Sequence, residues 1–336
     1  PLKAFFSPGR SPMHFLSVLS VAFAAASLAV SAPALAQSYP VKPVRIIAAF
    51  PPGGAADLLA RVVADKLSSA LGQSFVVENR PGAGGTIGAD AVAKAAPDGY
   101  TLLLGVTASQ TIAPAVYKSL PYDAARDFRP ISLVATIPVV LVVHPSITAN
   151  NARELVAIAK ASSQPLQFAS SGSGAIPHLA GELFQLSQGV KLQHVPYKGA
   201  PLAMSDLLAG RVQLMFDNLP TVLPHIRSGK MRALAVAGTR RAKVLPELPT
   251  LSEAGVPNVE VGSWFGVLAP AATPDAVAAI LSREIAKAVA ADDAKARMEA
   301  MGAEPAYLAP DEFARLIRAD TEKWAGLVKA TGARAD

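Results

Sequence analysis

Small and hydroxyl-bearing residues stand at the ends of predicted strands in both halves of the chain. They occur as Gly53-Gly54, Thr107-Ala108-Ser109 and Ser171-Gly172-Ser173-Gly174. Such loops present backbone N–H groups and Ser or Thr hydroxyls, which bind a carboxylate without a buried countercharge. Each loop alone is explained equally well as a plain turn. Their recurrence at the same end of predicted strands favours one shared anion site.

The first of these loops joins a predicted strand to a predicted helix. The apolar run 44–50 indicates a buried strand, Pro51-Pro52-Gly53-Gly54 ends it, and residues 55–71 repeat apolar side chains at helical spacing. The first amides of a helix have no partner inside it and carry the positive end of its dipole, so this turn is a candidate anion site. We expect Gly54 to need a positive φ. Asp57 also fits the simpler role of a first-turn acid that faces the dipole.

Sequence motifs that would indicate an enzyme are incomplete. The stretch 82–88 has Ile87 where the dinucleotide-binding G-x-G-x-x-G pattern needs glycine, and no G-x-x-x-x-G-K-[ST] stretch occurs. A nucleophile elbow around Ser173 needs glycine at Ser171. His178 and Glu182 are four residues apart on a predicted helix, but a surface or core-edge pair explains them more simply than a metal site. We predict no catalytic residue, no metal and no cofactor.

The composition limits the class of protein. The chain has 336 residues, of which 51% are hydrophobic and 17% charged, so it has room for about two globular domains. Cysteine is absent, which excludes disulfides, thiolate metal sites and a cysteine nucleophile. The net charge of +6 comes without a long Lys/Arg block, and we therefore expect no binding to nucleic acid.

Residues 1–36 have the order of an export signal. Lys3 and Arg10 precede the apolar run 15–30, and Ala34-Leu35-Ala36 forms a small-residue cleavage site. The apolar run is short and rich in small residues for a membrane span, although a retained anchor is the alternative. We expect cleavage after Ala36, which lowers the net charge from +6 to +4 because Lys3 and Arg10 are lost.

Strands and helices alternate in two series. The pattern predicts strands at 44–50, 74–78 and 100–106, and again at 166–169, 192–197, 212–216 and 232–237. Such alternation is typical of parallel sheets covered by helices, whose ligands lie beyond the carboxyl ends of the strands. Two apolar runs, within 133–144 and at 264–269, are predicted to cross between the series, and residues 122–130 to form turns. Helices are expected at 274–291, 294–301 and 310–331.

Six stretches together carry a resemblance to a known family. They are 39–47, 50–57, 78–85, 97–101, 195–199 and 215–217, and they stand in this order across the chain beyond the export signal. The chain resembles the periplasmic solute-binding receptors of tripartite tricarboxylate transporters, also called the Bug family. The resemblance implies an α/β, type II periplasmic-binding-protein fold: two α/β lobes joined by crossing strands around a ligand cleft. We expect lobe 1 at 37–138 plus 264–336 and lobe 2 at 139–263.

The resemblance also implies a function and a set of ligand-binding residues. It implies a periplasmic monomer that binds a small carboxylate, largely through backbone amides, and delivers it to the membrane components of a tripartite tricarboxylate transporter. The carboxylate could be a dicarboxylate, a tricarboxylate, an amino acid or an aromatic acid, and a ligand sensor or a hydrolase are the alternatives. The family's binding positions map onto Phe50, Gly53, Gly54, Ala55, Ala56, Asp57, Thr107, Ala108, Ser109, Ser171, Gly172, Ser173, Gly174, Tyr197 and Asp217.

Overall fold

The computed structural model describes residues 39–335, so the predicted export signal lies outside the described residues. The strands are β1 (Val44–Ala48), β2 (Phe75–Asn79), β3 (Thr101–Val106), β4 (Phe128–Val143), β5 (Leu166–Ser170), β6 (Leu192–Pro196), β7 (Leu214–Asn218), β8 (Arg232–Val236), β9 (Gly262–Pro270) and β10 (Glu304–Leu308). The helices are α2 (Ala55–Leu71), α3 (Thr86–Ala93), α4 (Ala113–Val116), α5 (Ala152–Ala161), α6 (Ile176–Gln188), α7 (Ala200–Leu208), α8 (Leu219–Arg227), α9 (Asp275–Ala290), α10 (Asp292–Ala300) and α11 (Pro310–Thr331), with short turns η2 (Ala83–Gly85) and η3 (Ala108–Ile112).

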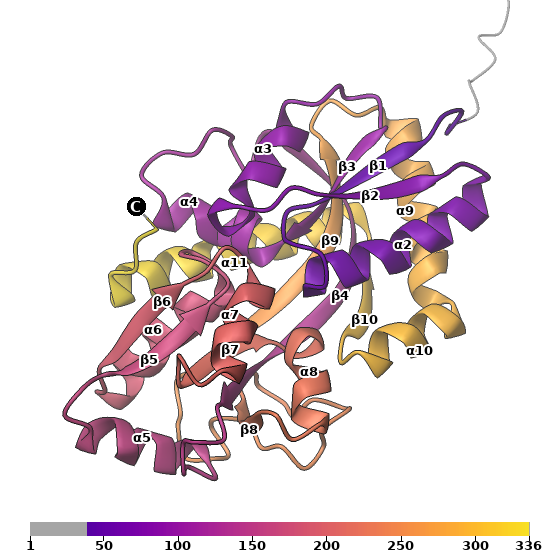
Figure 1. Ribbon diagram of the computed structural model, residues 1–336. Helices are drawn as coiled ribbons and strands as arrows, with labels where there is room; N and C mark the ends of the chain where they lie inside the picture. The colour runs from indigo at the N-terminus through magenta and orange to yellow at the C-terminus, as the bar shows by residue number, and fades with distance from the viewer. Residues whose placement is uncertain (1–38, 336) are drawn as a thin grey trace, which may run out of the picture. The chain divides into compact units, whose positions relative to one another are not determined.

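The strands form one continuous path in the order β2-β1-β3-β9-β4-β7-β5-β6, and β8 and β10 also pair with β4. β1 is parallel to β2 and β3, and β5 is parallel to β6 and β7, as the sequence predicted. β4 and β9 run antiparallel to their neighbours and connect the two parallel sets (Figure 1). We call β1, β2, β3 and β10 the first strand group, and β5, β6, β7 and β8 the second.

β4 changes its pairing partner in the middle. Its last pair with β9 is Pro138 with Gly262, and its first pair with β7 is Val139 with Asn218. β4 also begins at Phe128, so the prediction that residues 122–130 form only turns was wrong at its end. Pro130 misled the prediction, because proline is rare inside sheets except at bulges. A register shift between Pro130 and Ser132 accommodates it.

β10 was missed by the sequence analysis. Glu304–Leu308 is five residues long, contains Pro305 and is only partly buried, so it carries no clear strand periodicity. It pairs antiparallel with β4, with Glu304 opposite Thr136. Edge strands are where proline is tolerated, because its missing N–H then costs no ladder hydrogen bond.

Helices cover both faces of the sheet in each group. In the second group, Phe168 packs into a core with α5 and α6, whereas its neighbour Ala169 packs into a separate core with α7 and α8. Successive residues of a strand face opposite sides, so this β5 pair shows that both faces are buried, as parallel sheets require. α11 takes part in both groups: Phe313 belongs to the core of the first and Trp324 to that of the second.

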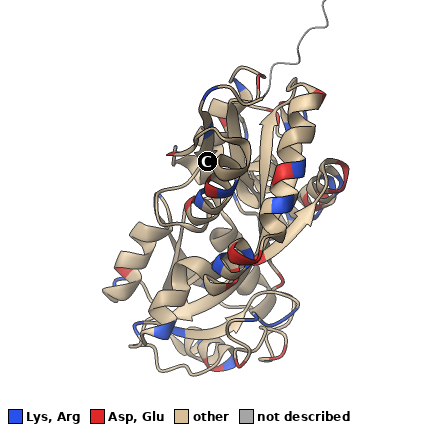
Figure 2. Cartoon of the chain, turned by 90° about the vertical axis from the view of Figure 1, so that its right-hand side faces the viewer, with Lys and Arg blue, Asp and Glu red and all other residues tan. Residues whose placement is uncertain are grey.

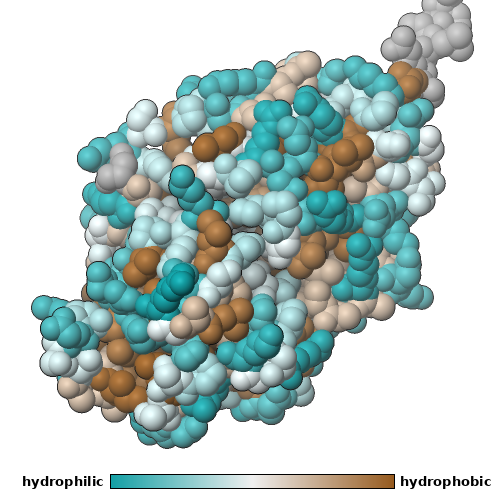
Figure 3. Space-filling view, in the orientation of Figure 1, coloured by the Kyte–Doolittle hydropathy of each residue, from teal (hydrophilic) through white to brown (hydrophobic). Residues whose placement is uncertain are grey.

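The outer surface is polar and of mixed charge. Figure 2 shows acidic and basic residues interspersed along the chain in that view, and ion pairs such as Arg297–Asp65 at 2.7 Å join α10 to α2. Figure 3 shows apolar residues as separate patches on the face drawn. Scattered apolar residues are normal on a protein surface. Within the described residues, every helix is too short or too polar to span a bilayer.

The contact between β9 and α11 depends on a glycine. A Cβ atom at Gly266 would lie 2.3 Å from Cζ of Phe313 and 2.8 Å from the carbonyl oxygen of Ser132. We predict that Gly266→Ala lowers the free energy of unfolding by about 1–3 kcal/mol, because overpacking forces a buried ring to move. Urea unfolding of the purified protein measures the change.

Gly326→Ala in α11 is the matched control, because a Cβ there meets no atom within 4 Å. It should raise stability by roughly 0.5–1 kcal/mol, since alanine is favoured over glycine inside a helix. Equal effects of the two substitutions would contradict the packing described for Gly266.

Candidate functional site

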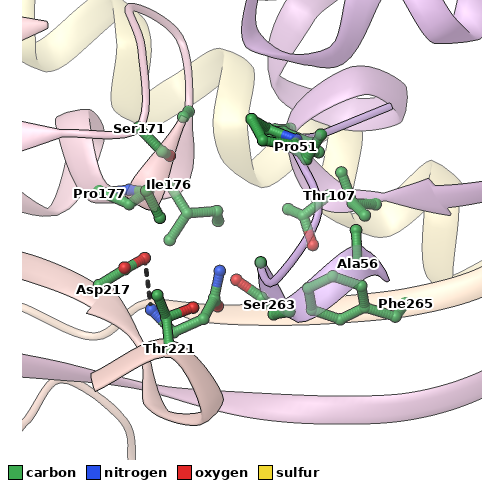
Figure 4. Close-up of a pocket in the computed structure, with 18 of the residues that line it drawn as sticks. Pro51, Ala56, Thr107, Ser171, Ile176, Pro177, Asp217, Thr221, Ser263 and Phe265 are labelled. Atoms are coloured by element: carbon green, nitrogen blue, oxygen red, sulfur yellow. Dashed lines mark hydrogen bonds between the residues drawn. The ribbon is translucent and has the colours of Figure 1, made fainter. Parts of the chain in front are cut away.

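A cavity lies at the carboxyl ends of strands from both groups and contains roughly 500 Å³ of space free of protein atoms, part of it open to solvent. Figure 4 shows side chains from the two groups facing each other across it. The lining residues are Phe50, Pro51, Gly54, Ala55, Ala56, Val106, Thr107, Ala108, Ser171, Ala175, Ile176, Pro177, Ala200, Pro201, Asp217, Asn218, Thr221, Ser263 and Phe265.

Four helices begin at the wall of this cavity. Its lining includes the first residues of α2 and α7, the first two residues of α6 and, at α8, the N-cap residue and third helical residue. The N-terminus of each helix carries a positive partial charge, so four such ends together favour a bound anion. None of the described lining residues is Lys, Arg or His. The attraction for an anion therefore comes from the backbone.

Several amides at these helix starts are available to a ligand. In α2, Leu58 N donates to the Gly54 carbonyl, while the amides of Ala55 and Ala56 have no hydrogen-bond partner within residues 39–335. In α6, the amide of Ile176 is likewise without a partner in the described chain. These unpaired N–H groups, two at the start of α2 and one at the start of α6, can donate to a carboxylate from two sides.

Asp57 holds the first loop in place from behind the cavity. Its Oδ2 accepts from Gly53 N at 3.0 Å and from Arg61 Nε at 3.1 Å, and its Oδ1 accepts from Asn79 Nδ2 at 3.0 Å. Burial alone raises the pKa of Asp57, but these hydrogen bonds outweigh it and lower the pKa below the usual value. Asp57 does not line the cavity; it orients the loop that does.

The positive φ of this loop falls on Gly53, with φ +80°, and not on Gly54, with φ −78°. The prediction for Gly54 was therefore wrong. The turn places the Gly53 amide toward Asp57, and the left-handed conformation occurs there. Gly54 is extended and serves as the N-cap of α2, with its flank open to the cavity.

The predicted site residues after β3 divide into two kinds. Thr107 and Ala108 line the cavity, whereas Ser109 is fully buried outside its lining. The Ser109 carbonyl accepts from the Tyr122 hydroxyl at 2.6 Å. Thr107 Oγ1 accepts from Trp264 N at 2.9 Å, which ties the end of β3 to β9. The helical turn that follows is a π-helix, a form often found at functional sites.

The predicted site residues of loop 171–174 also lie in different places. Ser171 lines the cavity, while Gly172, Ser173 and Tyr197 line a neighbouring hollow that shares Phe50, Pro51 and Ser171 with it. Gly174 lines neither; its amide donates to His178 Nδ1 at 3.1 Å. The Tyr197 hydroxyl donates to Asp206 Oδ2 at 2.7 Å, and burial together with this bond raises the pKa of Tyr197 to about 12.

His178 and Glu182 form a partly buried pair behind the same loop. His178 Nε2 lies 3.7 Å from Glu182 Oε1, and the His178 ring stacks on His194 with centroids 4.1 Å apart. Burial lowers the pKa of His178 to about 4, so the ring is neutral at pH 7. In the described part of the chain, no group of three or more His, Asp or Glu residues could hold a metal ion.

Asp217 is the penultimate residue of β7 and faces the cavity (Figure 4). Its Oδ1 accepts from Asn218 N at 2.8 Å. Burial raises the pKa of Asp217 to about 7, against 3.8 for an ordinary Asp. Asp217 is the one ionisable residue among the described lining residues.

Loops of the two groups touch at the edge of the cavity. A Cβ atom at Gly199, before α7, would lie 2.5 Å from Cγ of Pro51. A Cβ atom at Gly84 would lie 3.0 Å from the carbonyl oxygen of Ser173. Both glycines have positive φ, at +118° and +63°. The close approach of the two groups therefore depends on residues without side chains.

Sequence reasoning did not assign the helix starts of the second group to the site. α6, α7 and α8 begin with Ile176-Pro177, Ala200-Pro201 and Leu219-Pro220. Proline in the first turn of a helix loses no hydrogen bond, so this repeated X-Pro pair is the signal that could have marked these helix starts as parts of one site. Ser263 and Phe265 were also missed, because β9 was predicted only as a crossing strand.

Two linked α/β strand groups with a cavity between their strand ends define a solute-binding receptor fold. Residues 59–333 match the model of the tripartite tricarboxylate transporter family receptor, and the chain belongs to this family. The fold class predicted from the sequence is thereby confirmed.

The chain is similar to three proteins over most of its length. The chain is 40% identical over 322 residues to protein BugT of Bordetella pertussis, covering 96% of this chain and 98% of that protein. It is similar to the structure of R. palustris Rpa4515 with adipate, with TM-score 0.86, 37% identity and coverage of 88% and 99%. It is also similar to MatC from Rhodopseudomonas palustris with bound malate, with TM-score 0.81, 31% identity and coverage of 86% and 100%.

The burial of Asp217 predicts a pH dependence of stability. Because its pKa is raised to about 7 in the folded protein from 3.8, the folded state holds this proton more tightly than the unfolded chain. The stabilisation is complete below pH 4 and is lost as the pH rises through 7. Between pH 4 and pH 8, the wild type should lose on the order of 4 kcal/mol more unfolding free energy than Asp217→Asn, because the variant lacks this titrating carboxyl group.

Urea unfolding of the ligand-free protein at a series of pH values measures this difference. Thr221→Val, at another lining residue but without an ionisable group, should keep the pH profile of the wild type. Parallel stability curves for the wild type and Asp217→Asn would show that the carboxyl is solvated.

Proposed function

We propose that this protein is an exported, periplasmic receptor that binds a small carboxylate in the cavity. It delivers the ligand to the membrane components of a tripartite tricarboxylate transporter. The observation that carries the proposal is the convergence of four helix N-termini on one cavity, where the amides of Ala55, Ala56 and Ile176 have no partner among the described residues. A site built from backbone donors neutralises a carboxylate without the desolvation cost of a buried Lys or Arg.

The chemistry of related proteins supports the same ligand class. Adipate and malate, present in the two similar structures, are small molecules with two carboxyl groups. The cavity offers donors on two sides, from α2 in the first group and from α6 in the second. A ligand with a carboxylate at each end fits such a site. A ligand with one carboxylate and a different polar group at its other end also fits.

We propose that the two strand groups act as lobes that close on the ligand, with boundaries near residues 138 and 263. The change of partner within β4, from Gly262 opposite Pro138 to Asn218 opposite Val139, supports this boundary. The touching loops at Gly199 and Pro51 correspond to the closed state. α11 packs on both groups and must bend or slide during opening.

A hydrolase is the weaker interpretation. The described residues do contain a Ser–His pair, since Ser170 Oγ lies 2.6 Å from His194 Nε2. Ser170 is fully buried and, like His194, is not among the residues that line the cavity. A nucleophile must reach the bound substrate, so this pair supports the loop that begins at Ser171 and does not attack a ligand.

Calorimetry tests the receptor proposal. We expect adipate or malate to bind the purified protein, and the corresponding neutral diamide to bind at least about tenfold more weakly, because helix N-termini favour anions. A hundredfold excess of ligand over its Kd should raise unfolding stability by about 2.7 kcal/mol.

Gly199→Ala should weaken binding by at least about tenfold, because its Cβ would lie 2.5 Å from Cγ of Pro51 in the closed state.

The matched control is Gly189→Ala, which also has positive φ, +60°, but no atom within 4 Å of the added Cβ. It should leave the Kd unchanged. Adding Pro51→Ala to Gly199→Ala should restore part of the affinity, because it removes the clashing ring atoms. Equal binding of acid and diamide would argue against the anion site, and unchanged binding by Gly199→Ala would argue against closure at this contact.

A further inference from the structure

One wall of the cavity carries a cluster of buried polar atoms without hydrogen-bond partners. They are Asp217 Oδ2, Asn218 Oδ1, Thr221 Oγ1 and Ser263 Oγ. Elsewhere in the described residues, only Gln110 and Trp324 have a buried side-chain N or O atom without a partner, since Asp90 Oδ1 forms an ion pair with Lys94 at 2.6 Å. Polar atoms in protein interiors are nearly always paired, so four orphans at one cavity indicate a missing partner there.

The wall comes from three elements that lie close together. Asp217 and Asn218 end β7, Thr221 lies in the first turn of α8, and Ser263 belongs to β9. Figure 4 shows Asp217, Thr221 and Ser263 along the lower part of the cavity, away from Ser171 and Pro51. Asp217 is 1% exposed, so bulk water does not solvate its carboxyl group.

The chemistry of this wall differs from that of the helix amides. The Asp217 carboxylate accepts hydrogen bonds but donates none when ionised, and the Thr221 and Ser263 hydroxyls can both accept and donate. A second ligand carboxylate placed against an ionised Asp217 would be repelled, since like charges at close range disfavour each other. An N–H or O–H donor placed there would pair with Oδ2 and remove the cost of leaving it unsatisfied.

We infer that the ligand is a small carboxylate that also carries an ammonium or hydroxyl group, with its carboxylate on the helix amides and its donor group on Asp217. This inference rests on the proposed receptor function and narrows its ligand class. Amino acids and hydroxy acids share the required chemistry. Unsubstituted dicarboxylates lack the donor and leave Asp217 Oδ2 without a partner.

Matched series of ligands test this inference by calorimetry at pH 8. The probes are succinate, malate and aspartate, then glutarate, 2-hydroxyglutarate and glutamate, then adipate and 2-aminoadipate. In at least one series, the wild type should bind the hydroxy or amino member at least about tenfold more tightly than the unsubstituted member. Asp217→Asn should reduce that preference to within about threefold.

Asp217→Asn also distinguishes a ligand that carries an ammonium group from one that carries a hydroxyl group. An ammonium ligand loses its charge partner in Asp217→Asn, so its affinity should fall at least about a hundredfold. A hydroxyl ligand can still donate to the Asn amide oxygen, so its loss should be about tenfold. Ser171→Ala, at a lining residue in the upper part of the view in Figure 4, is the control and should change all members of a series equally.

The outcomes distinguish this inference from the receptor proposal. If unsubstituted acids bind as tightly as their substituted partners in every series, the receptor stands and the inference falls. A preference that survives in Asp217→Asn also overturns it, because the donor then lies elsewhere. If no carboxylate binds, both fall. Should Asp217→Asn fail to fold by circular dichroism, Ser263→Ala and Thr221→Val provide the same comparison, with a smaller expected loss of preference.

Discussion

The backbone N–H groups at the start of α2 and α6 are the constraint on which the site depends. Each helix leaves its first amides unpaired, and here they are unpaired at the wall of a cavity. The fold places them there because parallel strands end at one edge of each sheet and the following helices begin at that edge. Joining two such edges through β4 and β9 brings helix starts from both groups to one cavity.

Hydrogen bonds behind the cavity keep these amides pointed at it. Asp57 fixes the turn before α2 by accepting from Gly53, Arg61 and Asn79. In the second group, His178 Nδ1 accepts from the Gly174 amide, and Ser170 Oγ accepts from Gly172 N at 3.2 Å. The charged and titratable groups behind these two loops therefore support them, while the cavity surface at the starts of α2 and α6 is small, apolar or backbone. Such preorganised donors need little rearrangement when an anion binds.

Asp217 is the exception to this arrangement, since it brings an acidic group to the cavity surface. Burying a carboxyl group with one oxygen unpaired reduces stability, and its raised pKa reflects that cost. Costs of this kind are often found at binding sites, where the ligand supplies the missing partner. The neighbouring α8 N-terminus partly offsets the cost, because its dipole favours the ionised form.

The sequence predicted most of the helices and strands because their patterns are local. α2 was predicted at its observed bounds, Ala55–Leu71, from apolar spacing and the glycine turn before it. β10 was missed because its pairing with β4 is a long-range contact with no local periodicity. α8 begins at Leu219 with Pro220 in its first turn, a helix-start signal that the sequence analysis did not use.

The candidate site could be predicted less completely than the fold. Loop positions such as Gly54, Thr107 and Ser171 do line the cavity. Side-chain directions, however, depend on tertiary partners. Asp57 and Tyr197 were predicted to bind the ligand, but the Asp57 carboxylate accepts from Arg61 and the Tyr197 hydroxyl donates to Asp206. Ser263 reaches the cavity only because β9 crosses between the groups, which a linear pattern cannot reveal.

A crystal structure of the protein with a bound carboxylate tests the central claim most directly. The backbone account predicts carboxylate oxygens about 2.7–3.2 Å from the amides of Ala55, Ala56 or Ile176, directly or through one ordered water. It is contradicted if the carboxylate pairs with a basic side chain, such as Lys198 in the neighbouring hollow, and leaves the helix amides without a ligand.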